Sequence, residues 1–285
     1  MIFCLVACTT KQNTAGSRFW QSFTAKYNTY FNGHEAYKEG VDAQISGNVD
    51  NYTEILPFFP VGNEATRNIG KSQFDRAITK SEKAIQLHSI KVKPEVNPTK
   101  SRNEKTKQFL RRKEFNPFLK HAWLLMGQAQ FQKGDFLGAA STFSYITRRY
   151  AAEPPVVQEA RTWMARSYAE LGWFYDAEDA LDKVRRDSIP ARLGGELAAT
   201  RADLLLRQER FADALPYLTT AVRKTRNRKL RARLYFLLGQ VEQQLGHRAE
   251  AYRALGKCVR LPTNSNSTPA SSKRKCSRRR AEHAR

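Results

Sequence analysis

The sequence predicts an all-α protein whose main part is a solenoid of about four stacked helical hairpins. Two observations carry this prediction. Four segments between residues 117 and 261 align without gaps through their cores, and each joins two amphipathic stretches by a short turn. A small residue recurs in the second stretch of every segment, at Ala139, Ala177, Ala214 and Ala251. A regular period of this size is typical of arrays in which each hairpin buries its apolar face against the next.

The four segments fit the tetratricopeptide pattern, W-x₂-L-G-x₂-Y in the first helix and A-x₃-F in the second. In the first copy, AWLLMGQAQFQKGDFLGAASTF, Trp123 and Gly127 fall on signature positions, as Gly239 does in the fourth. The third copy has Glu209 where the others have a turn glycine. Small residues are needed where the two helices of a hairpin cross closely. An ordinary bundle with accidental similarity is the alternative, and four copies in one frame argue against it.

The regions on either side of the repeats are less regular. Residues 17–90 predict an irregular helical region with a break near Asn32-Gly33 and a repeat-like helix at its end. Residues 91–116 are polar and basic, and predict an exposed linker with little structure. Residues 262–285 have no aromatic residue, Leu, Ile or Val, so we expect a disordered basic tail. It is either a genuine basic arm or the product of a frameshift near residue 262, which the abrupt change of composition favours.

Composition and motifs give no sign of an active site. The 285 residues carry 49 Lys and Arg against 27 Asp and Glu, a net charge of +22 that favours an acidic partner. The GKS at residues 70–72 lacks the earlier glycine of a phosphate-binding loop, because Ala65 stands there. The five histidines are scattered singly and no cysteine pair has metal-ligand spacing. We therefore expect a protein that is not an enzyme and has no cofactor or metal.

A binding surface remains. In stacked hairpins of this kind, first-helix residues between the signature positions line an inner groove. In the second to fourth copies these positions hold long polar side chains suited to a peptide or protein partner. They are Thr162, Arg166, Glu170, Asp203, Arg207, Gln240 and Gln244. The alternative is that they are merely solvated.

The aromatic block near the start adds a family resemblance. SRFWQSFTAKYNTYFNGHEAYKEG, followed by ILPFFP and FDRAITKSEKAIQLHSI, resembles the PorW/SprE family, the tetratricopeptide lipoproteins of Bacteroidetes linked to type IX secretion and gliding. The resemblance covers residues 8–260. Because members of that family are considerably longer, it implies an N-terminal fragment of a non-catalytic protein. It also implies an outer-membrane lipoprotein that faces the periplasm and binds secretion-machinery proteins.

The same resemblance gives a meaning to the opening MIFCLVAC. This stretch is too short to cross a bilayer and incomplete as a signal peptide. Leu5-Val6-Ala7-Cys8 fits the lipobox L-x-[AG]-C, so the resemblance implies lipidation at Cys8, with residues 1–16 as residual signal and tether. Only seven residues, without Lys or Arg, precede Cys8, and a start codon assigned too late would produce this.

Three functional hypotheses therefore stay open at this point. The first is a lipid-anchored scaffold for secretion and gliding components at the outer membrane. The second is a soluble tetratricopeptide adaptor in which MIFCLVAC begins an ordinary helix. The third is a basic helical-repeat protein associated with nucleic acid, which is disfavoured because the aromatic residues lie in repeat-core phase and the basic ones in linkers and tail.

Overall fold

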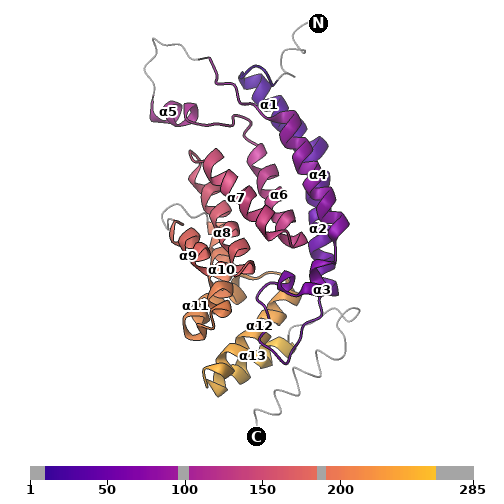
Figure 1. Ribbon diagram of the computed structural model, residues 1–285, viewed down its shortest axis with the longest axis vertical. Helices are drawn as coiled ribbons and strands as arrows, with labels where there is room; N and C mark the ends of the chain where they lie inside the picture. The colour runs from indigo at the N-terminus through magenta and orange to yellow at the C-terminus, as the bar shows by residue number, and fades with distance from the viewer. Residues whose placement is uncertain (1–9, 96–102, 185–190, 261–285) are drawn as a thin grey trace.

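Helical hairpins follow one another through the second half of the chain (Figure 1). Their first helices are α6 (Leu119–Lys133), α8 (Pro154–Glu170), α10 (Gly194–Arg207) and α12 (Arg228–Gln244). Their second helices are α7 (Phe136–Arg149), α9 (Phe174–Asp182), α11 (Phe211–Lys224) and α13 (Arg248–Arg260). The computed structural model describes residues 10–95, 103–184 and 191–260, and all regular structure within them is helical. The predicted solenoid of four hairpins is therefore confirmed.

Two predicted features lie outside the described residues. One is Cys8, the expected lipidation site, and the other is the tail over residues 262–285. Both stay predictions, as do the boundaries of the expected domains. No helix within the described ranges combines the length and the apolar character needed to cross a bilayer.

The turns inside the hairpins share one backbone conformation. Gly134, Gly172 and Gly246 adopt φ values of 90°, 76° and 77°, in the left-handed region that glycine enters without strain. Glu209 takes the same place in the third hairpin, with φ of 58°. Among the described residues, it is the one residue other than glycine that adopts a positive φ. The turn therefore keeps its conformation without a glycine. The cost is steric strain at Glu209, whose Cβ lies close to the following carbonyl oxygen in this conformation.

Glycine also allows the two helices of a hairpin to touch. A Cβ on Gly127 would lie 2.7 Å from the ring of Phe143, and a Cβ on Gly239 would lie 2.7 Å from Leu255. Real Cβ atoms do not approach this closely, so the first and fourth hairpins need glycine at these two crossings, whereas the second and third have Ala165 and Ala202 at the same position. A small residue in the first helix thus makes room for the large residue of the second helix that packs against it.

The N-terminal region contains a further hairpin that packs on the solenoid. A single helical rod runs through α1 (Ala15–Thr24), the π-helical turn η2 (Ala25–Tyr30) and α2 (Phe31–Gly47). Its partner is α4 (Lys71–His88), which lies between α2 and α6 (Figure 1). Gly40 meets Phe74 as Gly127 meets Phe143, because a Cβ there would lie 2.7 Å from the Phe74 ring. The repeat-like character of α4 is confirmed by the burial of Phe74 and Ala77.

The expected break near Asn32-Gly33 is wrong. The helix continues through both residues, and Gly33 is buried where a Cβ would lie 3.0 Å from the Cβ of Lys80. The glycine is present for close approach to α4 and does not end the helix.

The expected basic linker also differs from the structure. Residues 103–116 contain the helix α5 (Glu104–Leu110), and Phe115 is buried. The Glu114 carboxylate accepts hydrogen bonds from the backbone N–H groups of Ile90 and Asn116, at 2.9 and 3.0 Å. It also pairs with Arg149 at 3.2 Å. The end of the linker is thus fixed to the body of the molecule by a buried carboxylate.

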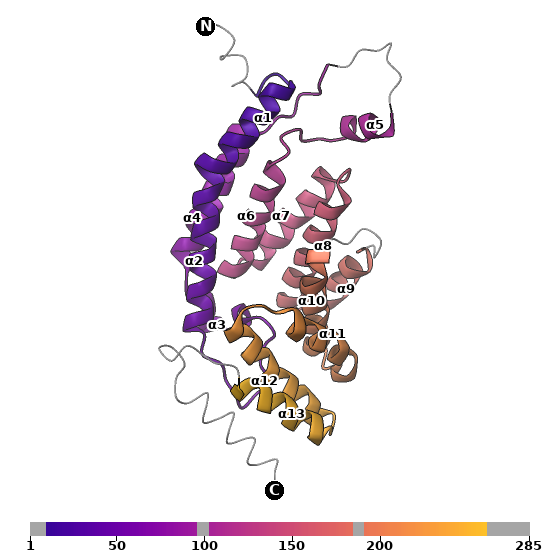
Figure 2. The same cartoon turned by 180° about the vertical axis from the view of Figure 1, so that it is seen from behind.

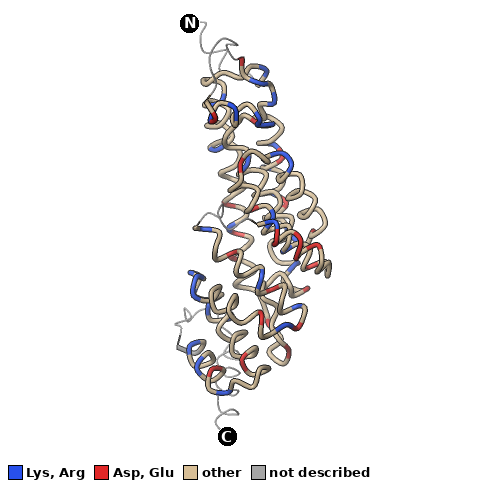
Figure 3. Tube along the Cα trace, turned by 90° about the vertical axis from the view of Figure 1, so that its left-hand side faces the viewer, with Lys and Arg blue, Asp and Glu red and all other residues tan. Residues whose placement is uncertain are grey.

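Charge is spread along the molecule. Lys and Arg recur over its whole length, with acidic residues among them (Figure 3). This agrees with the sequence, in which the basic clusters are dispersed and define no single basic domain.

Candidate functional site

A segment of the N-terminal region fills the groove of the solenoid. The loop between α2 and α4 includes the short turns η3 (Pro60–Gly62) and α3 (Glu64–Arg67). Residues 50–62, which we name the groove segment, lie against first helices of the later hairpins. Figures 1 and 2, taken from opposite sides, both show this loop beside α12. The inner face is therefore occupied by the chain itself.

Arg233 of α12 binds the segment at three places. Its Nε lies 2.8 Å from Asp50 Oδ2 and its Nη2 lies 3.0 Å from Asp50 Oδ1, a two-pronged ion pair. The same guanidinium donates to the backbone carbonyls of Phe58 and Pro57, at 2.7 and 2.5 Å. Burial would raise the pKa of Asp50, but the charge of Arg233 and its hydrogen bonds outweigh this, and the pKa is lowered.

Gln240 forms hydrogen bonds with the backbone of the segment. Its amide Nε2 donates to the carbonyl of Glu54 at 2.6 Å, and its Oε1 accepts from the N–H of Leu56 at 3.1 Å. The side-chain amide thus pairs with an extended peptide as a neighbouring strand would. Such contacts depend on the backbone and hold any side chain whose size fits.

Apolar residues of the segment complete the core between hairpins. Leu56 and Phe58 are buried in the cluster formed by α10, α11, α12 and α13. Val61 is buried in a second cluster, formed by α6, α7 and α8. One short segment therefore joins two hydrophobic cores that the solenoid itself keeps apart.

The predicted residues of α8 are buried rather than open. The Thr162 hydroxyl donates to Gln158 of its own helix at 2.9 Å. The Arg166 guanidinium donates to Thr200 at 3.0 Å and lies 4.2 Å from the ring centroid of Phe59 in the groove segment. Burial lowers the pKa of Arg166 against the opposing charge of Glu196.

Three further predicted residues form one buried network. Arg207 Nη2 lies 2.6 Å from Glu170 Oε1, and Arg207 Nε lies 3.1 Å from Asp203 Oδ2. Two carboxylates thus share one guanidinium, with Arg67 a more distant cation at 3.9 Å from Glu170. Burial raises the pKa of Glu170 to about 7, Arg207 opposes the shift, and Asp203 adds to it. Burial also raises the pKa of Asp203.

The structure therefore brings six of the seven predicted groove residues into contacts within the chain and leaves Gln244 exposed. Whether any of them binds a partner stays a prediction. Sequence reasoning missed Asp50 and Arg233. The signal for Arg233 was its helical spacing from Gln240, seven residues on, which places both on one face of α12.

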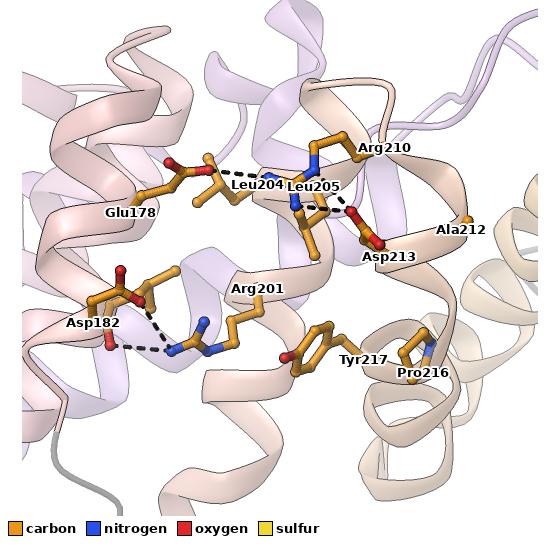
Figure 4. Close-up of a pocket in the computed structure, with 11 residues that line it drawn as sticks. Glu178, Asp182, Arg201, Leu204, Leu205, Arg210, Ala212, Asp213, Pro216 and Tyr217 are labelled. Atoms are coloured by element: carbon orange, nitrogen blue, oxygen red, sulfur yellow. Dashed lines mark hydrogen bonds and ion pairs between the residues drawn. The ribbon is translucent and has the colours of Figure 1, made fainter.

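A second concavity lies on the outer side, between α9, α10 and α11 (Figure 4). Its charged side chains pair with one another. Arg210 Nη2 lies 2.8 Å from Asp213, Arg210 Nη1 lies 3.4 Å from Glu178, and Arg201 lies 3.8 Å from Asp182. No cluster of His, Cys, Asp and Glu in the described parts of the chain has the geometry of a metal site.

Stacked helical hairpins with a polar inner face define a class of proteins, the helical-repeat scaffolds that bind other proteins. Residues 108–191 and 200–257 match the tetratricopeptide-repeat family model. The repeat region of this chain belongs to the tetratricopeptide-repeat family.

Solved structures of other tetratricopeptide proteins are similar to the chain. One is TTC0263, a thermophilic protein of Thermus thermophilus, with 15% identity and a TM-score of 0.42 over 75% of this chain and 91% of that one. Another is the TPR2AB domain of yeast Sti1 in its pHSP90 complex, with 16% identity and a TM-score of 0.27 over 79% and 96% of the two chains. No curated protein matches the chain. The family model and the two structures above give no evidence for the PorW/SprE family.

Proposed function

We propose that this chain is a non-catalytic, lipid-anchored tetratricopeptide scaffold that holds protein components of the type IX secretion and gliding machinery at the periplasmic face of the outer membrane. The scaffold function is supported by the groove segment, which shows that the inner face can hold an extended polypeptide. Gln240 and Arg233 hold it largely through backbone groups. The choice of machinery and location rests on the resemblance in the aromatic block and the lipobox at Cys8.

The proposed anchor would lie close to the start of the folded body. The helix α1 begins at Ala15 and is capped by Thr14, whose hydroxyl accepts from the Ser17 N–H at 3.1 Å. The stretch from Cys8 to this cap is short, so lipid chains on Cys8 would keep the N-terminal end of the stack near the bilayer. Several acyl chains, rather than one, give stable attachment.

Occupancy by the segment limits how a partner can use the groove. The segment is tied into helices on both sides, so its effective concentration at the groove is on the order of millimolar. A partner peptide that binds the same surface must displace it, whereas exposed Gln244 and the outer surfaces are open to a partner directly. We infer that stable partners contact the edge of the groove and that the segment gives this edge its shape.

Palmitate labelling in a Bacteroidetes host tests the anchor. We expect label on the wild-type protein and none on Cys8→Ala, with Cys258→Ala as the matched control that keeps the label. Equal labelling of Cys8→Ala would contradict the lipobox, and the soluble adaptor would then be the better description.

A pull-down from envelope fractions tests the partners. Secretion and gliding components should be recovered with the wild-type protein and reduced with Gln244→Ala. The exposed substitution Tyr175→Ala, on the outer helix α9, is the matched control. Recovery of no such component with wild-type protein would contradict the proposed machinery.

A further inference from the structure

The first part of the helical rod, from α1 through η2 to the start of α2, has its large aromatic side chains on the outside. Its buried positions are small or polar, namely Ser17, Gln21, Ala25, Thr29 and Gly33. Its exposed positions carry large aromatic side chains, Phe19, Trp20, Phe23, Tyr27 and Phe31. Phe19 is 70% exposed and Phe31 is 54% exposed. A helix that faced only water would place these rings inward, so this aromatic face is built to contact something else.

The polar side of the rod is fixed by specific contacts, so the aromatic face cannot simply rotate inward. Gln21 Oε1 lies 2.6 Å from His88 Nδ1 of α4, and the Thr24 hydroxyl lies 3.3 Å from the same nitrogen. Ala25 is fully buried in a small cluster with Ala84 and Leu119. The orientation of the rod is thus set by α4 and α6, and the aromatic residues remain outside.

The π-helical turn keeps the aromatic residues in line. Residues four apart on an α-helix drift by about 40° at each step, because a turn holds 3.6 residues. Phe19, Phe23, Tyr27 and Phe31 are all four apart, as are the buried Ser17, Gln21 and Ala25. The wider turn of η2 opposes this drift between residues 25 and 30. Both faces therefore stay straight, and successive rings meet: Phe23 and Tyr27 have centroids 4.8 Å apart.

The charge around this face is predominantly positive. The first 34 residues of the chain contain no Asp or Glu, and Lys11, Arg18 and Lys26 lie within or beside the rod. The neighbouring residues 87–95 and 103–113 add seven Lys and Arg against two Glu. Asn13 donates to the Val92 carbonyl at 2.6 Å and Arg18 lies over the Phe109 ring, so these segments meet the rod. Blue Lys and Arg segments mark this N-terminal end in Figure 3.

We propose that the aromatic face of α1 and η2 lies in the headgroup region of an anionic phospholipid surface. Trp and Tyr are enriched at membrane interfaces, and Phe supports partial insertion of a helix that lies flat. Lys and Arg beside the helix are attracted to anionic headgroups near the surface. The face has aromatic rings and no Leu, Ile or Val.

This inference adds a second membrane contact to the proposed function, made by the polypeptide itself. The two can be separated, because the aromatic face is present when Cys8 is not acylated. All tests therefore use the full chain with Cys8→Ala. Failure of the aromatic face would leave lipidation and partner binding untouched.

The experiment is vesicle flotation with phosphatidylcholine alone and with about 30% phosphatidylglycerol added. The test variant is Phe19→Ser/Phe23→Ser/Tyr27→Ser. The matched control is Leu137→Ser/Tyr175→Ser, which removes side chains that are 56% and 83% exposed elsewhere. All substituted residues are at the surface, so thermal unfolding should stay close to that of the parent.

We expect the parent and the control to float with anionic vesicles and the test variant to partition at least about tenfold less. Brominated lipids should quench the fluorescence of the parent more than that of its Trp20→Phe variant. The basic tail is unchanged in every variant, so it cannot produce these differences. Equal binding by test variant and parent would overturn the proposal. So would concentration-dependent dimers that depend on the aromatic residues without vesicle binding, since a second copy would then cover the face.

Discussion

Arg233 and Asp50 form a two-pronged ion pair whose side chains are only 9% and 4% exposed, although 183 positions separate them in the chain. The pair connects the loop of the N-terminal hairpin with the last hairpin of the solenoid. In most repeat arrays each hairpin contacts only its neighbours. Here the groove segment adds a direct connection between hairpins that are distant along the stack.

Removal of Arg233 should be strongly destabilising. The Arg233→Ala variant leaves the Asp50 carboxylate buried without its cation, and we expect the free energy of unfolding to fall by about 3–5 kcal/mol. Urea unfolding followed by circular dichroism measures this. The matched control is Arg76→Ala, which breaks an exposed pair with Glu39 at 2.7 Å and should cost less than about 1 kcal/mol. Similar losses in both variants would contradict the role of the buried pair.

Glycine at position 209 should stabilise the protein. Glu209 has φ of 58°, and the left-handed region costs a side-chain-bearing residue about 1 kcal/mol. Glu209→Gly should therefore raise the free energy of unfolding by about 0.5–1 kcal/mol. Gly172→Ala is the reciprocal change, since a Cβ there meets nothing within 4 Å and only backbone strain is added. Its melting temperature should fall, and a rise would argue against the strain explanation.

The contact of Gly40 with Phe74 predicts a steric cost. Gly40→Ala places a Cβ 2.7 Å from a fully buried ring, so we expect a loss of about 1–3 kcal/mol. Gly256→Ala is the control inside another helix, where a Cβ has open space and helix propensity improves stability by about 0.5–1 kcal/mol. Thermal unfolding of the two variants should shift in opposite directions, and a shared direction would contradict the steric account.

The Glu170 network predicts a pH dependence of stability. The pKa of Glu170 is raised to about 7 from 4.5, so the folded protein binds the extra proton between these values. This contribution is complete below the unfolded pKa and is lost as the pH rises through about 7, at most about 3 kcal/mol.

Urea unfolding across this pH range compares wild type with Glu170→Gln, which should have a flatter profile. Glu39→Gln, at an exposed position, is the control and should keep the wild-type profile. An unchanged profile in Glu170→Gln would show that this carboxyl does not take up the proton.

The solenoid was predictable because its determinants are local. Turn conformation, close helix crossing and burial repeat at a fixed spacing, so Gly127 and Ala139 identify their hairpin from a few residues of sequence. The continuous N-terminal rod was not predictable in the same way. Gly33 is typical of a helix break when only neighbours in sequence are considered, and its purpose appears only when α4 lies beside it.

The site was predictable in part. Repeat phase identified Arg166, Glu170 and Gln240 as inner-face residues, since phase alone decides which side of a helix a residue occupies. Their partners could not be predicted, because the groove segment lies far away in sequence and has no periodicity of its own. Arg233 stands in a basic run that is typical of a solvated surface, and only its contact with Asp50 distinguishes it from the rest.

The groove segment also has a mechanical consequence. A stack in which each hairpin contacts only its neighbours can extend under force, because each interface can open independently of the others. The segment spans several of these interfaces from inside, and its attachment at Arg233 fixes the curvature. A pulling force between the N-terminal end and α13 would have to extract Leu56 and Phe58 from their core before the hairpins could separate. We therefore expect the segment to make the stack stiffer under tension than its hairpin interfaces alone would be.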